Sequence, residues 1–507
     1  MLSLIDCGVK ELRDSAIVSD DMMRAIQLWE QMYRGEVPWR DTERHQWMNL
    51  PCKIAQEIAT KVTNEAEIKI QPTKERPAAD GLEIGTEGEQ PTAGQSQPEN
   101  GKEAPAKNLE RWEYINKAFE PVRKKLAIYA EYACAFGGIC FKPYLNGKNE
   151  IAIGIYNASM FYPTEYSAGQ EILSGFFLDQ KKQGKDWYCR VEKHEWDGED
   201  KYTVTNTCYK SATKDSIGKE CPLTEVSGWE NIEPSVTMRG VKHTLFSYFG
   251  IPLGNTIDQK SPLGVSVYSR AADHTRDADE QYQSLKWEYE GGEMAVDISD
   301  DALGVDEDGE MMVPKHNERL YRRNGIPVTA GSGELIKTFS PTLRDTSYAN
   351  GLQTILRIIE DDAQLAHGTF SDPEKETKTA TEIRTSKTRT YDLVSKIQTA
   401  LGDALHALAH AVDAMISLYK LCPEGDWSFC AYWDDSIIED SDSERMNDRE
   451  DVSSGLMMEW EYRVKWYGET EEQAKKVLSE KNKQDDNAIM GFGNTEPAAN
   501  AGEGGRK

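Results

Sequence analysis

The helical pattern that runs from Thr379 to Tyr419 constrains the fold of this chain more than any other sequence feature. Apolar side chains recur there at spacings of three and four residues: Ile383, Tyr391, Val394, Ile397, Leu401, Leu405, Leu408, Val412 and Ile416. At 1.5 Å per residue this pattern predicts one helix roughly 60 Å long, well beyond the usual length in globular proteins. Because the apolar residues form a stripe, we expect one buried face and one exposed face.

Two further helical patterns precede the long one. The first is marked by apolar or aromatic residues at helical spacing: Leu263, Val267, Ala271, His274, Ala278, Tyr282, Leu285 and Tyr289. The second follows Ser340-Pro341 and contains Leu352, Ile355, Ile359 and Ala363. Strand-like runs at Glu293–Ile298 and Leu335–Phe339 lie between them. A polar loop, 367–378, then leads into the long helix.

The rest of the chain predicts an α+β fold with several modules. Residues 20–70 predict two helices around a turn and a short strand, whereas 71–108 is rich in Pro, Gly, Gln and Glu and predicts a disordered insertion. From 109 to 262 a helix leads into strand patterns, with Asn146-Gly147 as a hairpin turn signal. After an acidic stretch beginning at Asp434, helical patterns continue to 490, and 491–507 predicts a disordered tail.

Charge and cysteine content exclude several classes of protein. The formal net charge is -28, whereas a protein that grips DNA by neutralising phosphates needs a basic surface. A stable DNA reader is therefore excluded, and a conduit along which DNA slides is not. The nine cysteines contain no Cys-x-x-Cys pair, which argues against a zinc site, and their odd number favours a reducing compartment. We expect no signal peptide and no membrane span.

Motifs for catalysis or metal binding are weak. No Gly-x-x-x-x-Gly-Lys-Ser/Thr, Gly-x-Ser-x-Gly or His-Glu-x-x-His sequence occurs, so we expect no enzyme and no cofactor. His406 and His410 have a spacing that can bind metal, but without a third ligand in view helix packing is favoured. The acidic run 306–310 lacks the spacing of a calcium loop, so a turn is favoured there.

Four sequence stretches, taken in order, point to a family. They are Trp29–Tyr33 with Pro38-Trp39, Asn49–Pro51 and Ile54–Ala59; Ser261–Tyr268, opening the first helical pattern; Thr379–Ile383; and Trp433–Ile437. In this order and spacing the chain resembles the portal proteins of tailed bacteriophages, especially long-tailed phages of Gram-positive hosts. The resemblance covers nearly the whole chain and departs from the family pattern at the 71–108 insertion.

The resemblance implies a phage portal fold, divided along the chain as follows. The expected segments are 1–70, the N-terminal helical part of the wing; 71–108, the insertion; 109–262, the rest of the wing; 263–291 and 341–366, two channel-lining stem helices; 292–340, the clip; 367–378, the tunnel loop; 379–433, the long wing helix and its connection; 434–490, the crown; and 491–507, the tail.

The function implied is a channel at a capsid vertex of the virion, through which double-stranded DNA is packaged and ejected. Portal proteins assemble in the host cytoplasm as rings of about twelve subunits. They contact the major capsid and scaffolding proteins, and dock the terminase and then head-completion or tail adaptor proteins. An acidic wall suits DNA in transit because it repels phosphate. The alternative is a minor capsid or assembly scaffold protein without a channel.

The candidate site residues fall in three groups. Lys375 and Lys378 in the expected tunnel loop are candidates for contact with DNA, although solvated lysines are the alternative. Arg384, Lys387 and Arg389 are candidates for the channel wall, subunit ion pairs or the plain surface of a helix. Trp287 and Tyr289 are expected to pack at the stem-to-clip junction.

Overall fold

The computed structural model describes residues 10–40, 47–72, 110–299, 320–324, 336–372, 380–433, 441–467 and 473–478. The chain divides after Trp433 into two compact units, at the position where the sequence analysis places the start of the last module. We call residues 10–271 and 380–433 of the first unit its body. Its other parts are a helix pair, α6 and α7, and a tip sheet, β11 to β13. The proposed insertion at 71–108 and the tail at 491–507 lie outside the described residues, apart from positions 71 and 72.

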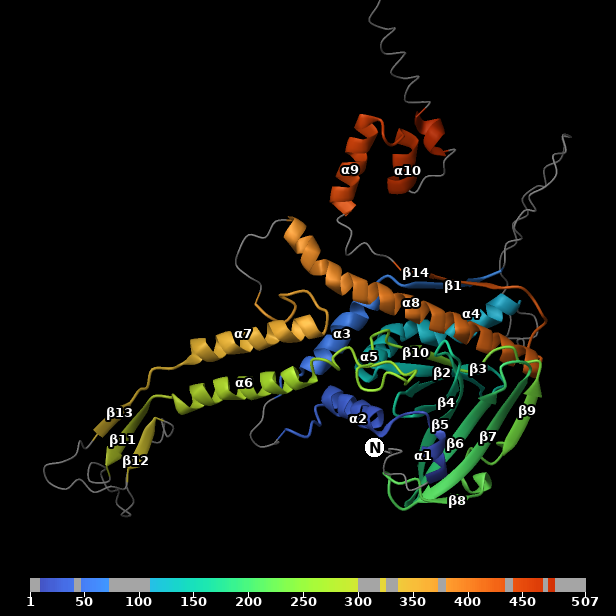
Figure 1. Ribbon diagram of the computed structural model, residues 1–507, viewed down its shortest axis with the longest axis horizontal. Helices are drawn as coiled ribbons and strands as arrows, with labels where there is room; N and C mark the ends of the chain where they lie inside the picture. The colour runs from blue at the N-terminus through green and yellow to red at the C-terminus, as the bar shows by residue number, and fades with distance from the viewer. Residues whose placement is uncertain are drawn as a thin grey trace, which may run out of the picture. The chain divides into compact units, whose positions relative to one another are not determined.

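Helices of the body enclose most of its core. They are α1 (Lys10–Ser15), α2 (Asp20–Arg34), α3 (Leu50–Thr63), α4 (Arg111–Lys124), α5 (Leu126–Phe136) and α8 (Ala380–Tyr419). The 40-residue α8 confirms the long helix predicted from the apolar stripe. Its buried face, which includes Ile397, Leu405 and Ile416, packs against α3 and the strands β2 and β10. Figure 1 shows α8 running across the body.

Three sheets complete the body. Their strands are β1 (Glu67–Gln71), β2 (Gly138–Leu145), β3 (Ile151–Asn157), β4 (Phe161–Tyr166), β5 (Ile172–Gln183), β6 (Asp186–Trp196), β7 (Lys201–Ser211), β8 (Lys219–Cys221), β9 (Ser235–Arg239), β10 (Ser247–Gly250) and β14 (Ser428–Tyr432). The strand orders are β1-β14, β10-β2-β3 and β4-β5-β6-β7-β8, with β9 also paired to β7. All these pairs are antiparallel, and the mixed composition of helix and sheet confirms the α+β class.

Two local predictions in the body, the Asn146-Gly147 hairpin and the helix after residue 109, are confirmed with changes in detail. The hairpin at Asn146-Gly147 is present between β2 and β3, but its loop is longer than two residues: Asn146 Oδ1 accepts hydrogen bonds from the N–H groups of Lys148 and Glu150, at 2.9 and 3.0 Å. The helix predicted after residue 109 is two helices. The first contains Pro121, and the chain tightens at Lys125, whose N–H bonds to Val122 O at 3.1 Å.

The first helix of the helix pair starts later than predicted. Residues 263–271 are not helical, and α6 runs from Ala272 to Gly291. The stretch is buried against α5 instead, where Val267 N–H bonds to Cys134 O at 3.0 Å. A Cβ atom added to Gly264 would lie 2.3 Å from Gly137 O, because the backbones of the two glycines are in direct contact. No residue with a side chain fits at position 264. Tertiary contact therefore outweighs the helical spacing in this stretch.

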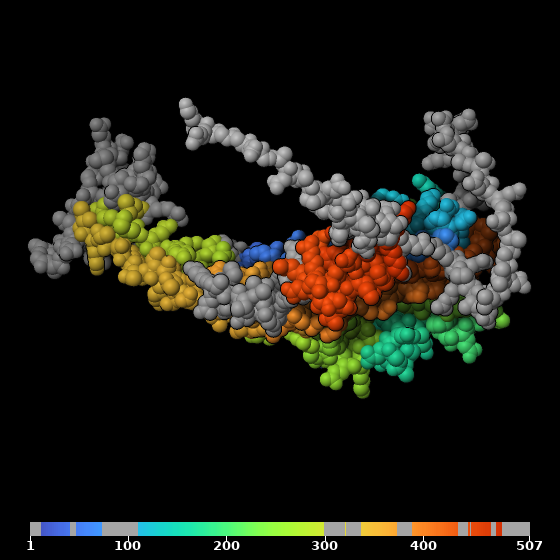
Figure 2. Space-filling view, turned by 90° about the horizontal axis from the view of Figure 1, so that it is seen from above, coloured from blue at the N-terminus to red at the C-terminus, as the bar shows by residue number. Residues whose placement is uncertain are grey.

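The helix pair consists of α6 and α7 (Asp345–Asp362), which lie side by side and carry the tip sheet at their far end (Figures 1 and 2). The tip strands are β11 (Ala295–Ser299), β12 (Tyr321–Asn324) and β13 (Ile336–Phe339). β11 is central, antiparallel to β13 and parallel to β12. The strand patterns at 293–298 and 335–339 are thus confirmed, and β12 was missed because its run Tyr-Arg-Arg-Asn has no apolar alternation.

The second unit is described by α9 (Ser441–Ser454), α10 (Glu459–Tyr467) and helical residues 473–478. Gly455, with a φ of 77°, follows the end of α9, and α10 begins at Glu459. Trp466 Nε1 of α10 donates to Asp448 Oδ2 of α9 at 2.7 Å. Within the described part of the chain, no helix is both long and apolar enough to cross a membrane.

Candidate functional site

The predicted loop lysines lie outside the described residues, so their side chains remain predictions. The segment 373–379, which contains Lys375 and Lys378, is bounded on both sides by described structure. Arg384 and Lys387 lie in the first turns of α8, and their side chains are also outside the described part. Arg389 is described: its guanidinium forms an ion pair with Asp361, at the end of α7.

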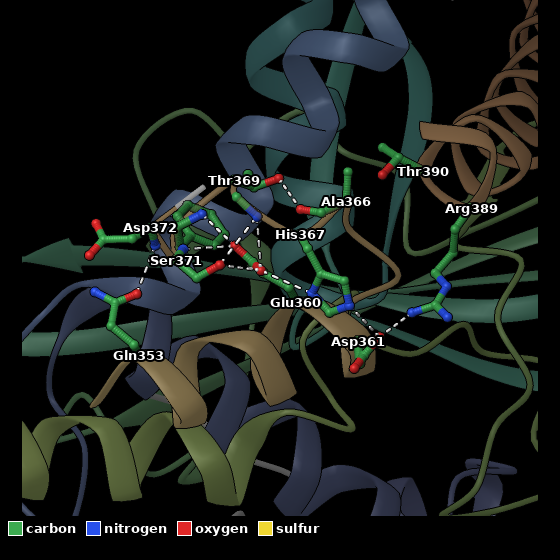
Figure 3. A network of polar contacts seen from close by, with 12 residues as sticks. Gln353, Glu360, Asp361, Ala366, His367, Thr369, Ser371, Asp372, Arg389 and Thr390 are labelled. Atoms are coloured by element: carbon green, nitrogen blue, oxygen red, sulfur yellow. Dashed lines mark hydrogen bonds and ion pairs between the residues drawn. The ribbon is translucent and has the colours of Figure 1, made fainter. Parts of the chain in front are cut away.

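A buried carboxylate organises the chain directly before this segment (Figure 3). Glu360, in the last turn of α7, is fully buried. Its Oε1 accepts from the N–H groups of Phe370 at 2.6 Å and Ser371 at 2.8 Å. Its Oε2 accepts from Ser371 Oγ at 2.8 Å and Gly368 N–H at 3.2 Å. One side chain therefore fixes the backbone of residues 368–371 against the helix that they follow.

The hydrogen bonds to Glu360 also set its protonation. Burial alone would raise the pKa of this carboxyl, but the N–H donors of Ser371 and Phe370, with the Ser371 hydroxyl, outweigh burial and hold the pKa below its ordinary value. Glu360 is therefore ionised at neutral pH. A buried carboxylate with four donors is satisfied, whereas the same group without them would cost several kcal/mol.

Three consecutive carboxylates end α7, and each bonds to a different part of the unit. Glu360 bonds to the loop backbone, Asp361 pairs with Arg389 of α8, and Asp362 Oδ2 lies 2.7 Å from His274 Nδ1 of α6. His367 lies beside the first two, with ring nitrogens 3.4 and 3.5 Å from the Glu360 and Asp361 oxygens. We call Glu360, Asp361 and Asp362 the carboxylate junction.

Charge at this position opposes the helix dipole. The C-terminal end of a helix carries partial negative charge, so three acidic residues there are unfavourable unless other groups compensate. The loop N–H groups, the Arg389 guanidinium of α8 and the His274 imidazole of α6 provide that compensation. Asp372 N–H also donates to Gln353 Oε1 at 2.7 Å, which holds the last described residue before 373 on α7. Asp372, before the 373–379 segment, and Arg389 of α8, well after it, are therefore both bonded to α7.

Polar links hold the helix pair in register along its length. At the body end His274 bonds Asp362, and in the middle Gln281 Nε2 donates to Tyr348 O at 3.1 Å. At the tip end Glu288 accepts from Arg344 Nη2 at 2.8 Å, Nε at 3.2 Å and N–H at 2.9 Å. The side chain and backbone of Arg344 hold the pKa of Glu288 below its ordinary value.

The predicted packing aromatics are not packed within this chain. Trp287 is 70% exposed and Tyr289 is 47% exposed, so packing within one chain is wrong for both. Other large apolar side chains near the tip sheet are exposed as well: Met294, Ile336, Phe339 and Leu343. The physical reason is that, of the described helices, α7 alone packs against this end of α6, and none of residues 281–291 is buried.

Charge on α6 is strongly acidic. Its acidic residues are Asp273, Asp277, Asp279, Glu280, Glu288 and Glu290, and its basic residues are Arg276 and Lys286. Four acidic residues and one arginine lie on α7: Asp345, Glu360, Asp361, Asp362 and Arg357. Asp279 and Glu360 are buried, but the remaining acidic residues still outnumber Arg276, Lys286 and Arg357, so the surface of the helix pair is acidic.

Sequence reasoning missed the carboxylate junction. The available signal was the run Glu-Asp-Asp at the end of a helical pattern, where the dipole predicts that each acid needs a donor. The position of those donors depends on the tertiary structure. Comparison with known proteins adds no assignment: no family model matches the chain, and the search of curated proteins found no match.

Proposed function

We propose that this chain is the subunit of a portal ring that conducts double-stranded DNA through a capsid vertex of a tailed bacteriophage. In this proposal the body and the helix pair correspond to the wing and stem, and the tip sheet corresponds to the clip. The segment 367–378 is the tunnel loop, and residues 434–490 form the crown. The motor and the head-completion proteins would dock on the ring as separate chains.

One observation carries the proposal. Two antiparallel helices, α6 and α7, project from the body and bear a small sheet, and α7 then connects through a short loop to the 40-residue α8. This order is what the resemblance implies for stem, clip, stem, tunnel loop and wing helix. The carboxylate junction supports it further, because Glu360 anchors residues 368–371 on α7 and Asp361 links α8 to the same helix.

The exposed apolar side chains of the helix pair support assembly of this chain with further copies of itself. Aromatic side chains such as Trp287 are costly to leave in water, and several lie together near the tip sheet. A closed ring needs two different complementary faces on each subunit, and a helix pair with two open sides provides them. The acidic surface supports a DNA conduit, since carboxylates that face the channel repel phosphate.

Electron microscopy of the purified full chain tests the proposal. The expected result is a ring with an axial hole, and native mass spectrometry should give a mass near twelve subunits. A ring of thirteen would agree with the proposal, because isolated portal subunits can close with an altered number. Monomers or dimers at micromolar concentration would contradict it and favour the minor capsid or scaffold alternative.

A further inference from the structure

Three imidazoles meet on the outer surface of the body, away from the carboxylate junction. His406 and His410 lie one turn apart on α8, and their Nε2 atoms are 3.2 Å apart. His243 comes from the connection between β9 and β10, and its ring centre lies 4.7 Å from that of His410. The sequence analysis favoured helix packing for the first two residues because no third ligand was in view. The tertiary structure brings one beside them.

The separation of the two Nε2 atoms matches that of two ligands of one metal ion. Zinc–imidazole bonds are about 2.0–2.1 Å long, so two nitrogens at a tetrahedral zinc lie about 3.3 Å apart. Histidines four residues apart on one helix face are a recurrent pair of zinc ligands. A hydrogen bond between two neutral imidazoles has nearly the same length. The separation of the two Nε2 atoms is therefore compatible with a bound metal ion and with a direct hydrogen bond. The residues around the imidazoles distinguish these two interpretations.

The surroundings leave these imidazoles available as ligands. In the described part of the chain His194, His274 and His367 each lie beside a carboxylate, whereas no ion pair is formed by His243, His406 or His410. Their other contacts are with aromatic rings: His406 stacks on Phe429 at 5.5 Å, and His410 lies 4.9 Å from Trp427.

We propose that His406 and His410 bind one divalent transition metal ion, such as Zn²⁺ or Ni²⁺, with His243 as the third ligand. Among the described residues no three ligands converge on one metal position. The proposed site therefore requires the exposed side chain of His243 to rotate toward His406 and His410 when the metal binds. Water would occupy the fourth position. Because Ala407 stands where a His-Glu-x-x-His protease has its glutamate, the site has no general base beside the metal.

The role that follows is a structural clamp. The metal would join α8 to the β9–β10 connection, next to the rings of Trp427, which precedes β14, and Phe429, which lies in it. Binding to the folded state alone would raise the thermal midpoint as metal concentration rises. This inference does not rest on the proposed portal function.

Titration of the tag-free, chelator-treated full chain with Zn²⁺ or Ni²⁺ in a calorimeter tests the site. We expect one ion per chain, with an upward shift of Tm. Losing a supporting residue usually weakens metal binding about 10–100-fold, so His406→Ala and His410→Ala should each weaken it by about 100-fold or more. His243→Ala should weaken it by about 10-fold, and His367→Ala, at a histidine elsewhere in the fold, should leave it unchanged.

The absorption spectrum of bound Co²⁺ gives a second measurement that needs no variant. Intense d–d bands would indicate the four-coordinate geometry proposed here. Absence of binding to the wild-type chain would overturn the site and leave a hydrogen-bonded imidazole pair. Equal affinity of wild type and His243→Ala would overturn the third ligand. Equal loss in His367→Ala would show that the ion binds elsewhere.

Discussion

The body and the helix pair of the first unit bury their apolar side chains to very different extents. The largest fully buried side chains all belong to the body: Trp29, Tyr202, Tyr268, Phe119, Phe141, Phe161, Phe176, Phe177, Phe246, Phe249 and Met22. The helix pair buries apolar side chains such as Leu356 and Ile359 near the body, and towards the tip sheet it exposes Trp287, Tyr289 and Leu343. The body therefore closes its own core, and the far half of the helix pair does not.

This difference shows two ways of holding a helix in place. In the body, α8 is held by burial of its apolar stripe over α3 and the β10-β2-β3 sheet. In the helix pair, three polar links fix the register of α6 against α7 and leave apolar surface open. An element held in this way keeps its shape in one chain and still offers a surface to another. That combination is what a subunit of a ring requires.

The largest effect is expected from truncating the core of the body. Phe141 on β2 is fully buried, so Phe141→Ala should lower the free energy of unfolding by about 3–5 kcal/mol through lost burial and a cavity. Calorimetric thermal unfolding of wild type and variant measures this loss. A change below about 1 kcal/mol would mean that the body core is not closed as described.

The matched truncation on the helix pair is Trp287→Ala. Because Trp287 is largely exposed, this change should alter the stability of the isolated chain by no more than about 0.5 kcal/mol. Ring formation, followed by electron microscopy, should decline if neighbouring subunits cover the residue. Normal ring formation by Trp287→Ala would contradict a role for this exposed aromatic residue in assembly.

The second largest effect concerns the carboxylate junction. Glu360→Ala removes the acceptor of three N–H groups of the loop backbone and the Ser371 hydroxyl, and leaving such buried donors unpaired should cost about 3 kcal/mol. The control is Asp361→Ala, which removes a half-exposed member of the same junction and should cost about 0–1 kcal/mol. Chemical denaturation compares the two, and equal losses would contradict the special role of Glu360.

The pH dependence of stability provides an independent check on Glu360. Because its folded pKa is lowered, the stabilisation from its charge is complete above the unfolded pKa of about 4.3 and is lost as pH falls through the folded value. Glu360→Gln should therefore make thermal stability less dependent on pH in this acidic range. An unchanged pH profile would show that other carboxylates dominate acid unfolding.

A smaller effect is expected at the outer link of the helix pair. Glu288→Gln weakens the contact with Arg344, whose side chain is 70% exposed, so solvent screens the charge of this pair. The thermal midpoint should fall only slightly, and less than in Phe141→Ala or Glu360→Ala. A fall as large as that of Phe141→Ala would show that polar links, and not burial, dominate the stability of this unit.

Substitution of the loop lysines is expected to change the amount of DNA packaged and to leave the stability of the chain unchanged. The double variant Lys375→Glu, Lys378→Glu should form normal rings and alter the amount of DNA packaged. The added carboxylates would face phosphates in a narrow channel, where like charges repel over about 8–10 Å. Normal packaging would mean that both lysines are merely solvated. Loss of rings would place the loop in the subunit interface.

Local signals in the sequence predicted much of the body and the two ends of the helix pair. The stripe of α8, the strands at the tip and the hairpin after β2 depend on neighbouring residues, so their patterns are visible without the fold. The start of α6 was misplaced by nine residues, from Leu263 to Ala272, because helical spacing there coincides with the packing of a buried segment of turns. The sequence did not predict the carboxylate junction or the group of three imidazoles, although His406 and His410 were recognised as a pair.

The amino-acid order alone specifies an acidic α+β chain with a very long helix preceded by a helix–strand–helix unit, since periodicity and charge are properties of neighbouring residues. The tertiary structure decides which distant groups meet. It pairs β1 with β14, sets Gly264 against Gly137, and places four donors around Glu360. The first two contacts join residues far apart in the chain, and the donors of Glu360 lie 8 to 11 residues beyond it. A hydrogen bond or a close approach of two backbones leaves no periodic trace in the sequence.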